Sequence, residues 1–158
     1  MAAHQDVDIR KLLDDSTFVG TIATLDESGA PYAVPSPFLR LNEEGQIVHL
    51  ELLETSTTHR NLLRSIWFEH PVTVSISGNN GVVVAKGRVH KVHVSGPVFS
   101  SYYREVRENL EDADLAGVWL IEVLEVIDET YAVRKVREEK YHPFFRHLDR
   151  LAYKETPS

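Results

Sequence analysis

The chain reads Thr17-Phe-Val-Gly-Thr-Ile-Ala-Thr-Leu-Asp-Glu-Ser-Gly-Ala-Pro-Tyr-Ala-Val-Pro-Ser-Pro-Phe38 near its N-terminus. β-Branched residues are frequent over 17–26, and the Asp-Glu-Ser-Gly that ends this stretch predicts a hairpin turn in which Gly29 needs a positive φ. Residues 30–41 form the expected return strand. Its three prolines cannot donate ladder hydrogen bonds, so part of this strand should lie at a sheet edge or be bulged.

Further helices and strands are predicted on either side of this hairpin. Helices are expected over 6–15, over 56–66 with Ser56 or Thr55 as N-cap, from Pro97 onward and from His142 onward. Strands are expected over 46–53, 71–77, 81–95 and, as one or two strands, 118–136. Successive strands of this kind are typical of a small antiparallel barrel with helices at its ends, so we expect a mainly β (α+β) fold.

The composition indicates one globular domain over 1–158, with a barrel core over about 16–136 and a helical tail over 137–158. A net charge of −7 argues against a general nucleic-acid binder, because phosphate binding needs a basic face. The chain has no cysteine, which excludes disulfides, a thiol nucleophile and cysteine-ligated metals. It shows neither signal-peptide regions nor an apolar run of about 20 residues, so we expect a cytoplasmic protein without a membrane partner.

A candidate phosphate site lies at the start of the helix over 56–66, in Thr55-Ser-Thr-Thr-His-Arg-Asn61. Unpaired backbone N–H groups at a helix N-terminus attract anions, the hydroxyls add donors, and His59, Arg60 and Arg64 add positive charge. The alternative is a solvated helix start in which Ser56 is only a cap. Three apolar residues of this helix are expected to face the core: Leu62, Leu63 and Ile66.

Three other features each have two interpretations. The broken ladder of Pro35-Ser-Pro-Phe38 leaves backbone groups free to meet the edge of a planar heterocycle, or simply blunts an edge strand. Lys86, Arg88 and His90 alternate along one strand face, where they either meet an anionic ligand or partner subunit or are solvated. Trp119 either stacks on a flavin or fills the core.

No catalytic or metal-binding motif stands out. His90 and His93 should point to opposite faces of a strand, and His142 and His147 do not stack on a helix, so neither pair has metal-ligand spacing. Nucleotide-binding glycine motifs, the zinc-protease motif and the nucleophile elbow are absent from the sequence. If the protein is an enzyme, its reactive group should therefore come from a cofactor.

Residues 10–95 resemble the pyridoxamine 5'-phosphate oxidase-like flavin-binding split barrels. The stretch from Val19 to Pro35 is similar to that family's opening hairpin, Arg60-Asn-Leu-Leu and His70-Pro-Val-Thr-Val-Ser to its helix and next strand, and Val84-Ala-Lys-Gly-Arg-Val to the following strand. The resemblance implies a six-stranded antiparallel split β-barrel with flanking helices, and a homodimer that binds two FMN molecules where the subunits meet. The implied cofactor-binding residues are Val34, Pro35, Ser36, Ser56, Thr57, Thr58, His59, Arg60 and Asn61, with Arg88 and Trp119 as further candidates.

Two positions depart from the family pattern. Thr58 stands where the family often has a lysine, and Leu52 where it often has a serine or threonine. The lost lysine removes a point charge from the phosphate site, which His59 or Arg60 could replace.

The functional expectation is an FMN-dependent oxidoreductase acting on a small molecule. The alternative is a non-catalytic module of the same fold that binds or senses flavin or haem. Tyr32–Phe38 is also similar to the haem-utilisation branch of the family, which binds haem through a late histidine, here His142 or His147.

Overall fold

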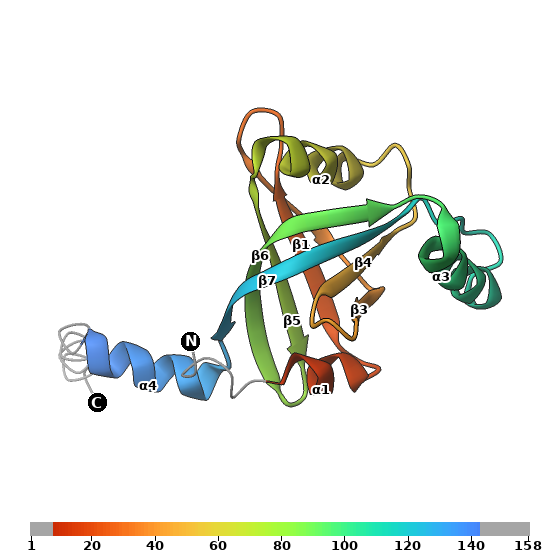
Figure 1. Ribbon diagram of the computed structural model, residues 1–158. Helices are drawn as coiled ribbons and strands as arrows, with labels where there is room; N and C mark the ends of the chain where they lie inside the picture. The colour runs from red at the N-terminus through yellow and green to blue at the C-terminus, as the bar shows by residue number, and fades with distance from the viewer. Residues whose placement is uncertain (1–7, 143–158) are drawn as a thin grey trace, which may run out of the picture.

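The computed structural model describes residues 8–142, which form seven strands and four helices (Figure 1). The strands are β1 (Val19–Leu25), β2 (Pro31–Pro35), β3 (Leu39–Leu41), β4 (Ile47–Glu51), β5 (Pro71–Gly78), β6 (Gly81–His93) and β7 (Gly117–Asp128). The helices are α1 (Ile9–Asp14), α2 (Thr57–Phe68), α3 (Gly96–Asn109) and α4 (Tyr131–Tyr141). None of these helices is long and apolar enough to cross a membrane.

All seven strands belong to one antiparallel sheet, in the order β2-β1-β5-β6-β7-β4-β3. The long strands β6 and β7 cross the molecule, and the curled sheet has α2 near one end and α1 near the other (Figure 1). Gly29 has a φ of 83° in the β1–β2 turn, as predicted. The structure therefore confirms the expected α+β split barrel, with seven strands rather than six.

The additional strand arises from the proline-rich segment. The return strand predicted over 30–41 is divided into β2 and β3, because Pro35 and Pro37 cannot donate ladder hydrogen bonds. β2 pairs only with β1, and β3 only with β4, so the two pieces lie at opposite edges of the sheet. The prediction that the prolines mark an edge is confirmed.

Residues 36–38 cross between these two edges of the curled sheet. The Ser36 backbone N–H donates to the Gly20 carbonyl of β1 at 2.8 Å, and the Phe38 carbonyl accepts from the Leu50 N–H of β4 at 3.3 Å. A Cβ atom at Gly20 would lie 2.7 Å from the Ser36 carbonyl oxygen, so glycine is needed for this close approach. The crossing places the Ser36 side chain beside β4.

The core contains two clusters of buried side chains. The larger includes Trp119 of β7, which has no exposed surface, together with aliphatic residues of β1, β5 and β6. The smaller packs Val106 of α3 against β4 and β7. On α2, the buried residues are Thr58, His59, Asn61, Leu62 and Ser65.

The prediction for the buried face of α2 is correct for Leu62 and wrong for Leu63 and Ile66. Leu62 has no exposed surface, whereas Leu63 and Ile66 are 38% and 37% exposed. Thr58, Leu62 and Ser65 lie three or four positions apart, so they share the stripe that faces the sheet. Small polar residues therefore occupy much of the contact between α2 and the barrel.

The strand predicted over 118–136 is too long, and the helical tail begins earlier than residue 137. β7 ends at Asp128, whose carboxylate accepts from the Thr130 backbone N–H at 2.9 Å, and α4 begins at Tyr131. The Thr130 hydroxyl also accepts from the Val82 N–H of β6 at 3.0 Å, which ties this turn to the sheet. Helix α4 has no buried residue and projects from the barrel (Figure 1). The helix predicted from His142 lies outside the described residues except for His142 itself.

Replacing Gly87 by alanine is expected to destabilise the fold by about 1–3 kcal/mol. Gly87 lies where the register of β6 against β7 shifts, and a Cβ atom there would collide with the backbone carbonyl of Glu122. Chemical denaturation measures the loss. The matched control is Lys86→Ala, the exposed neighbour, which should change the free energy of unfolding by less than about 0.5 kcal/mol. Equal losses in both variants would contradict the close contact at Gly87.

Candidate functional site

The start of α2 is capped as predicted. The Ser56 hydroxyl accepts from the His59 backbone N–H at 2.9 Å. The Arg60 guanidinium folds back over this turn and donates to the Thr55 carbonyl at 2.7 Å and to the Thr57 hydroxyl at 3.2 Å. A cationic group is thus held at a helix N-terminus, where an anion is favoured.

A cavity of about 530 Å³, the apolar cavity, lies between this helix start, the end of β2, β4 and residues 112–114. Val34 and Pro35 line it from β2, and Ser56 and Thr58 line it from the start of α2. The structure therefore brings together residues from both segments that the sequence singled out. Most of the remaining wall is apolar, and its titratable side chains are Tyr32, His49, Glu51, Asp112 and Asp114. Both the size and the apolar wall are those of a small-molecule site.

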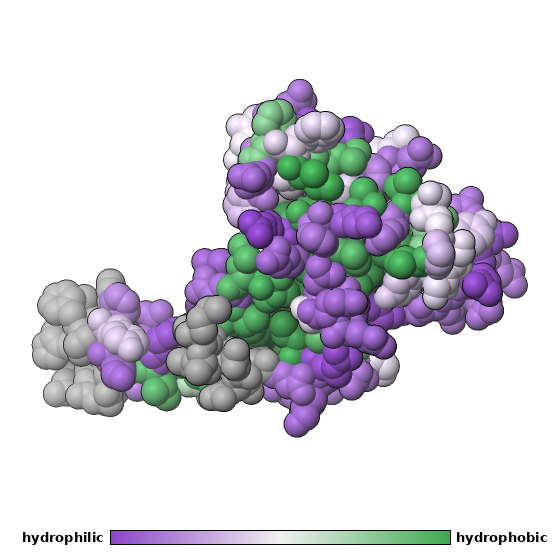
Figure 2. Space-filling view, in the orientation of Figure 1, coloured by the Kyte–Doolittle hydropathy of each residue, from purple (hydrophilic) through white to green (hydrophobic). Residues whose placement is uncertain are grey.

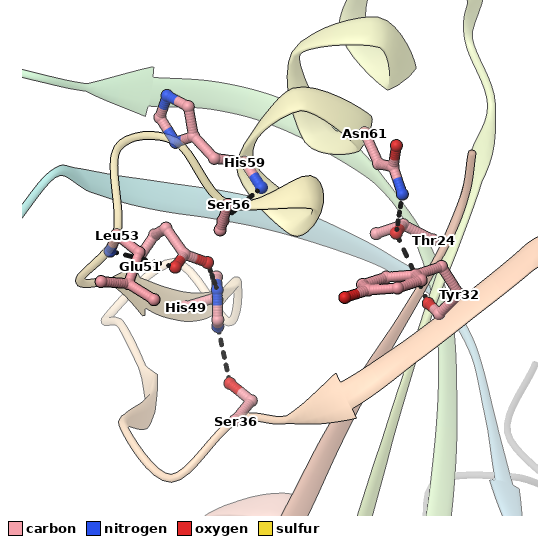
Figure 3. Close-up of polar contacts among 9 residues, drawn as sticks. All are labelled: Thr24, Tyr32, Ser36, His49, Glu51, Leu53, Ser56, His59 and Asn61. Carbon is pink, nitrogen blue, oxygen red and sulfur yellow. Dashed lines mark hydrogen bonds and ion pairs between the residues drawn. The ribbon is translucent and has the colours of Figure 1, made fainter. Parts of the chain in front are cut away.

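A smaller cavity of about 280 Å³, the arginine cavity, lies between the same turn of α2 and the β1–β2 hairpin. Its lining residues are Asp26, Glu27, Ser28, Thr57, Arg60, Asn61 and Arg64. Asn61 is almost fully buried, and its side-chain amide donates to the Thr24 hydroxyl at 3.1 Å (Figure 3). Asn61 thereby attaches α2 to β1, while Arg60 and Arg64 supply positive charge to this cavity.

Ser36, His49 and Glu51 form a buried hydrogen-bonded chain beside the apolar cavity (Figure 3). The Ser36 hydroxyl lies 2.6 Å from His49 Nδ1, and His49 Nε2 lies 3.0 Å from Glu51 Oε2. The Leu53 backbone N–H donates to Glu51 Oε1 at 3.2 Å. Of these three residues, only Ser36 was predicted from the sequence. His49 and Glu51 are two positions apart on a predicted strand, so their side chains share a face. This spacing is the sequence signal that could have identified them as a pair.

The pKa of Glu51 is lower than its ordinary value of 4.5. Burial alone would raise this pKa, but the hydrogen bond and positive charge of His49, the Leu53 N–H and the Ser56 hydroxyl together outweigh it. Burial lowers the pKa of His59, although Glu51 and Glu54 act in the opposite direction. Near neutral pH the Glu51 carboxylate is therefore an ionised acceptor beside a neutral His59.

His59 and Trp119 are buried and line neither the apolar nor the arginine cavity. Their rings meet edge to face with centroids 5.3 Å apart. Trp119 is fully buried, so the core interpretation holds and no face of its ring is free to stack on a flavin. Within residues 8–142, neither His59 Nδ1 nor Trp119 Nε1 has a hydrogen-bond partner.

The proposed basic stripe on β6 is paired with acidic residues of β7. Arg88 Nε donates to Glu122 Oε2 at 3.0 Å, and Lys86 Nζ lies 4.0 Å from Glu125 Oε2. Both ion pairs are exposed, so each contributes little to stability. Arg88 is not brought together with the helix-start residues in either the apolar or the arginine cavity.

The two strand histidines, His90 and His93, both border one cleft, as does Lys91 between them. A register shift between Val89 and Lys91 alters the alternation of β6, and His90 and His93 line one broad cleft of about 840 Å³ beside α3. No group of three potential metal ligands occurs among residues 8–142. At the end of α4, His142 Nε2 lies 3.6 Å from Glu138 Oε2, and His147 lies outside the described residues.

The stability that Glu51 contributes is expected to be lost in acid. Because its folded pKa is depressed, the contribution is complete above the unfolded pKa near 4.5 and disappears as the pH falls through the lower folded pKa. Denaturant titrations between pH 3 and pH 6 should therefore show a shallower pH dependence in Glu51→Gln than in the unaltered protein. The matched control, Glu54→Gln, removes an exposed carboxylate and should preserve the original slope.

Comparison with known proteins defines the class of fold. No family model and no curated protein matches the sequence. Solved structures do match the fold. An FMN-binding protein from Syntrophomonas wolfei aligns over 77% of this chain and 83% of its own, with a TM-score of 0.64 and 11% identity.

Two further matches have similar coverage. The HupZ protein of Group A Streptococcus aligns over 78% of this chain and 92% of its own, with a TM-score of 0.63 and 14% identity. A Lactobacillus delbrueckii protein assigned as a pyridoxamine 5'-phosphate oxidase aligns over 77% and 92%, with a TM-score of 0.56 and 17% identity. The chain therefore has the split-barrel fold of the pyridoxamine 5'-phosphate oxidase-like proteins, and the fold implied by the sequence resemblance is confirmed.

Proposed function

We propose that the apolar and arginine cavities together bind FMN, with the ring system in the first and the phosphate in the second. The observation that carries this proposal is their common position at one helix turn. Ser56 and Thr58 line the apolar cavity, while Thr57 and Arg60 line the arginine cavity. The name of the Syntrophomonas wolfei match, an FMN-binding protein, supports the same cofactor.

The donor set of this chain fits both ends of FMN. A mostly apolar wall suits a planar heterocycle, whereas hydroxyls, a helix N-terminus and two guanidinium groups suit a phosphate. Glu51, Asp112 and Asp114 would repel a phosphate from the apolar cavity. Asp26 and Glu27 also line the arginine cavity, but Arg60 and Arg64 balance their charge there, and Asp26 already accepts hydrogen bonds from Ser28 and from the Ala30 N–H. Charge therefore favours this orientation over its reverse.

We further propose that the protein is an oxidoreductase for a small molecule. Bound FMN would supply the redox chemistry, while the chain would bind the cofactor and orient it. The alternative is a non-catalytic flavin-binding module. Thr58 supports this alternative, because it is a buried, uncharged residue where the family often has a lysine. Haem gains no support, because His142 directly follows the projecting helix α4, and neither His142 nor α4 lines either cavity.

A homodimer is part of this proposal. Apolar surface runs across the barrel face seen in Figure 2. Several large apolar side chains are also exposed, among them Trp67 and Phe68 at the end of α2 and Tyr131 and Val136 on α4. Soluble monomers rarely leave large contiguous apolar patches uncovered. A second copy of the chain would cover such surface and could complete the cofactor site.

The test is an equilibrium titration of the cofactor-free protein with FMN, followed by the change in flavin fluorescence. We expect saturable binding, together with a dimer in sedimentation analysis. Failure to bind at tens of micromolar FMN would overturn the proposal. Turnover of bound FMN by a nicotinamide reductant in the presence of electron acceptors would then separate the oxidoreductase from the non-catalytic module.

A further inference from the structure

In the Ser36–His49–Glu51 chain, the His49 imidazole is hydrogen-bonded on both sides. Both His49 nitrogens have a partner: Nδ1 meets the Ser36 hydroxyl and Nε2 meets the Glu51 carboxylate. All three residues are buried, and His49 and Glu51 line the apolar cavity. An acid–base group is thus held in a fixed orientation beside the space where the ring system would lie.

The partners of His49 allow it both a neutral and a charged state. An ionised carboxylate can only accept, so Nε2 carries a hydrogen in either state. In the neutral state, Nδ1 accepts the hydrogen of the Ser36 hydroxyl. In the charged state, Nδ1 carries the added proton and donates it to the Ser36 oxygen. A hydroxyl can serve both states because it can donate or accept, whereas a backbone carbonyl could serve only one.

The charges around His49 make its protonation sensitive to the ligand. On its own strand it faces Glu51; Tyr32 of β2 and the carboxylates of Asp112 and Asp114 line the same cavity, and His59 of α2 interacts with it electrostatically. His59 is neutral near pH 7 because burial lowers its pKa, so the surrounding charges are negative. With neutral His49 the pair with Glu51 carries one negative charge, and with protonated His49 it carries none.

We propose that His49, held by Ser36 and Glu51, is a one-proton store for the ligand of the apolar cavity. When a reductant such as a reduced nicotinamide adds negative charge to that ligand, His49 Nδ1 takes up one proton from solvent, and it returns the proton when an electron acceptor reoxidises the ligand. The inference rests on the proposed flavin site and deepens it by naming the residues that compensate the charge. Glu51 and Ser36 are positioning residues for His49.

The test follows the titration of His49 directly. Full-length protein with ¹⁵N-labelled histidine is titrated from pH 5 to pH 9 by long-range ¹H–¹⁵N NMR without ligand, with FMN and with dithionite-reduced FMN. The reduced ring is the more negative probe. We expect the neutral Nε2–H tautomer at high pH, and a midpoint about one pH unit higher with reduced than with oxidised FMN. His90, exposed on β6, is the internal control and should show one midpoint throughout.

The outcomes separate the store from the cofactor site. His49→Gln identifies the signal by its disappearance; if that variant does not fold, the signal is the histidine resonance that Glu51→Gln moves most. Binding of FMN with one His49 midpoint for both oxidation states would overturn the store and leave the flavin site standing. A His49 that does not titrate between pH 5 and pH 9 would do the same. Absence of FMN binding would overturn the proposed function and the store together.

Discussion

Removing the Trp119 indole is expected to lower the free energy of unfolding by about 3–5 kcal/mol. Trp119 is fully buried in the larger core cluster and contacts His59 edge to face, so Trp119→Ala leaves a large cavity where β7 meets α2. The loss combines the transfer free energy of the indole with the cost of that cavity. Urea or thermal denaturation followed by circular dichroism measures it.

The second tryptophan provides a matched control. Trp67 lies near the end of α2 and is 79% exposed, so Trp67→Ala should change the stability of the monomer by less than about 0.5 kcal/mol. Each variant keeps one tryptophan, which allows both to be followed by fluorescence as well. A large loss in Trp67→Ala that depends on protein concentration would indicate that this residue is covered by a second copy. Equal, concentration-independent losses would contradict the burial described for Trp119.

Removing both arginines of the arginine cavity is expected to weaken FMN binding by about 10- to 100-fold, equivalent to about 1.4–2.8 kcal/mol. Arg60 and Arg64 line the cavity to which we assign the phosphate, and charge-assisted hydrogen bonds to phosphate are the strongest contacts proposed there. Riboflavin lacks the phosphate, so its affinity should be the same in Arg60→Ala/Arg64→Ala as in the unaltered protein. Fluorescence titration with both flavins measures the difference.

The control for this double variant is Arg104→Ala. Arg104 is an exposed residue of α3 that lines neither proposed cavity. Raising the ionic strength should weaken FMN binding in the unaltered protein more than in the double variant, because salt screens the removed charges. An equal loss of affinity for FMN and riboflavin would place the phosphate elsewhere. It would also indicate that the arginines only stabilise the start of α2.

The helix start and the proline segment were predictable because their chemistry is local. The Ser56 hydroxyl caps α2 by accepting a hydrogen bond from a backbone N–H three residues away, and Gly29 adopts the positive φ that its own turn requires. Pro35 and Pro37 break the ladder wherever the strand lies, although the division into β2 and β3 adds a strand that periodicity did not show. The cofactor, the homodimer and the cytoplasmic location remain predictions.

The candidate site was only partly predictable. Val34, Pro35, Ser56 and Thr58 do line one cavity, but Arg88 and Trp119 lie elsewhere. Trp119 could not be assigned from the sequence, because an aromatic residue on a strand suits either a ligand face or the core. A register shift between Val89 and Lys91 of β6, which periodicity did not show, lies beside the cleft that His90 and His93 line.

Residue patterns alone were enough for the mainly β (α+β) class, which follows from the succession of strands and helices. They were also enough for the β1–β2 turn and the cap of α2, since each depends on the backbone preferences of a few neighbouring residues. The buried Ser36–His49–Glu51 chain needed the tertiary structure. Ser36 and His49 are separated by 13 positions and meet because residues 36–38 cross from β2 to β3 and bring the serine against β4. Their hydrogen bond depends on how the curled sheet closes, and no local preference encodes that closure.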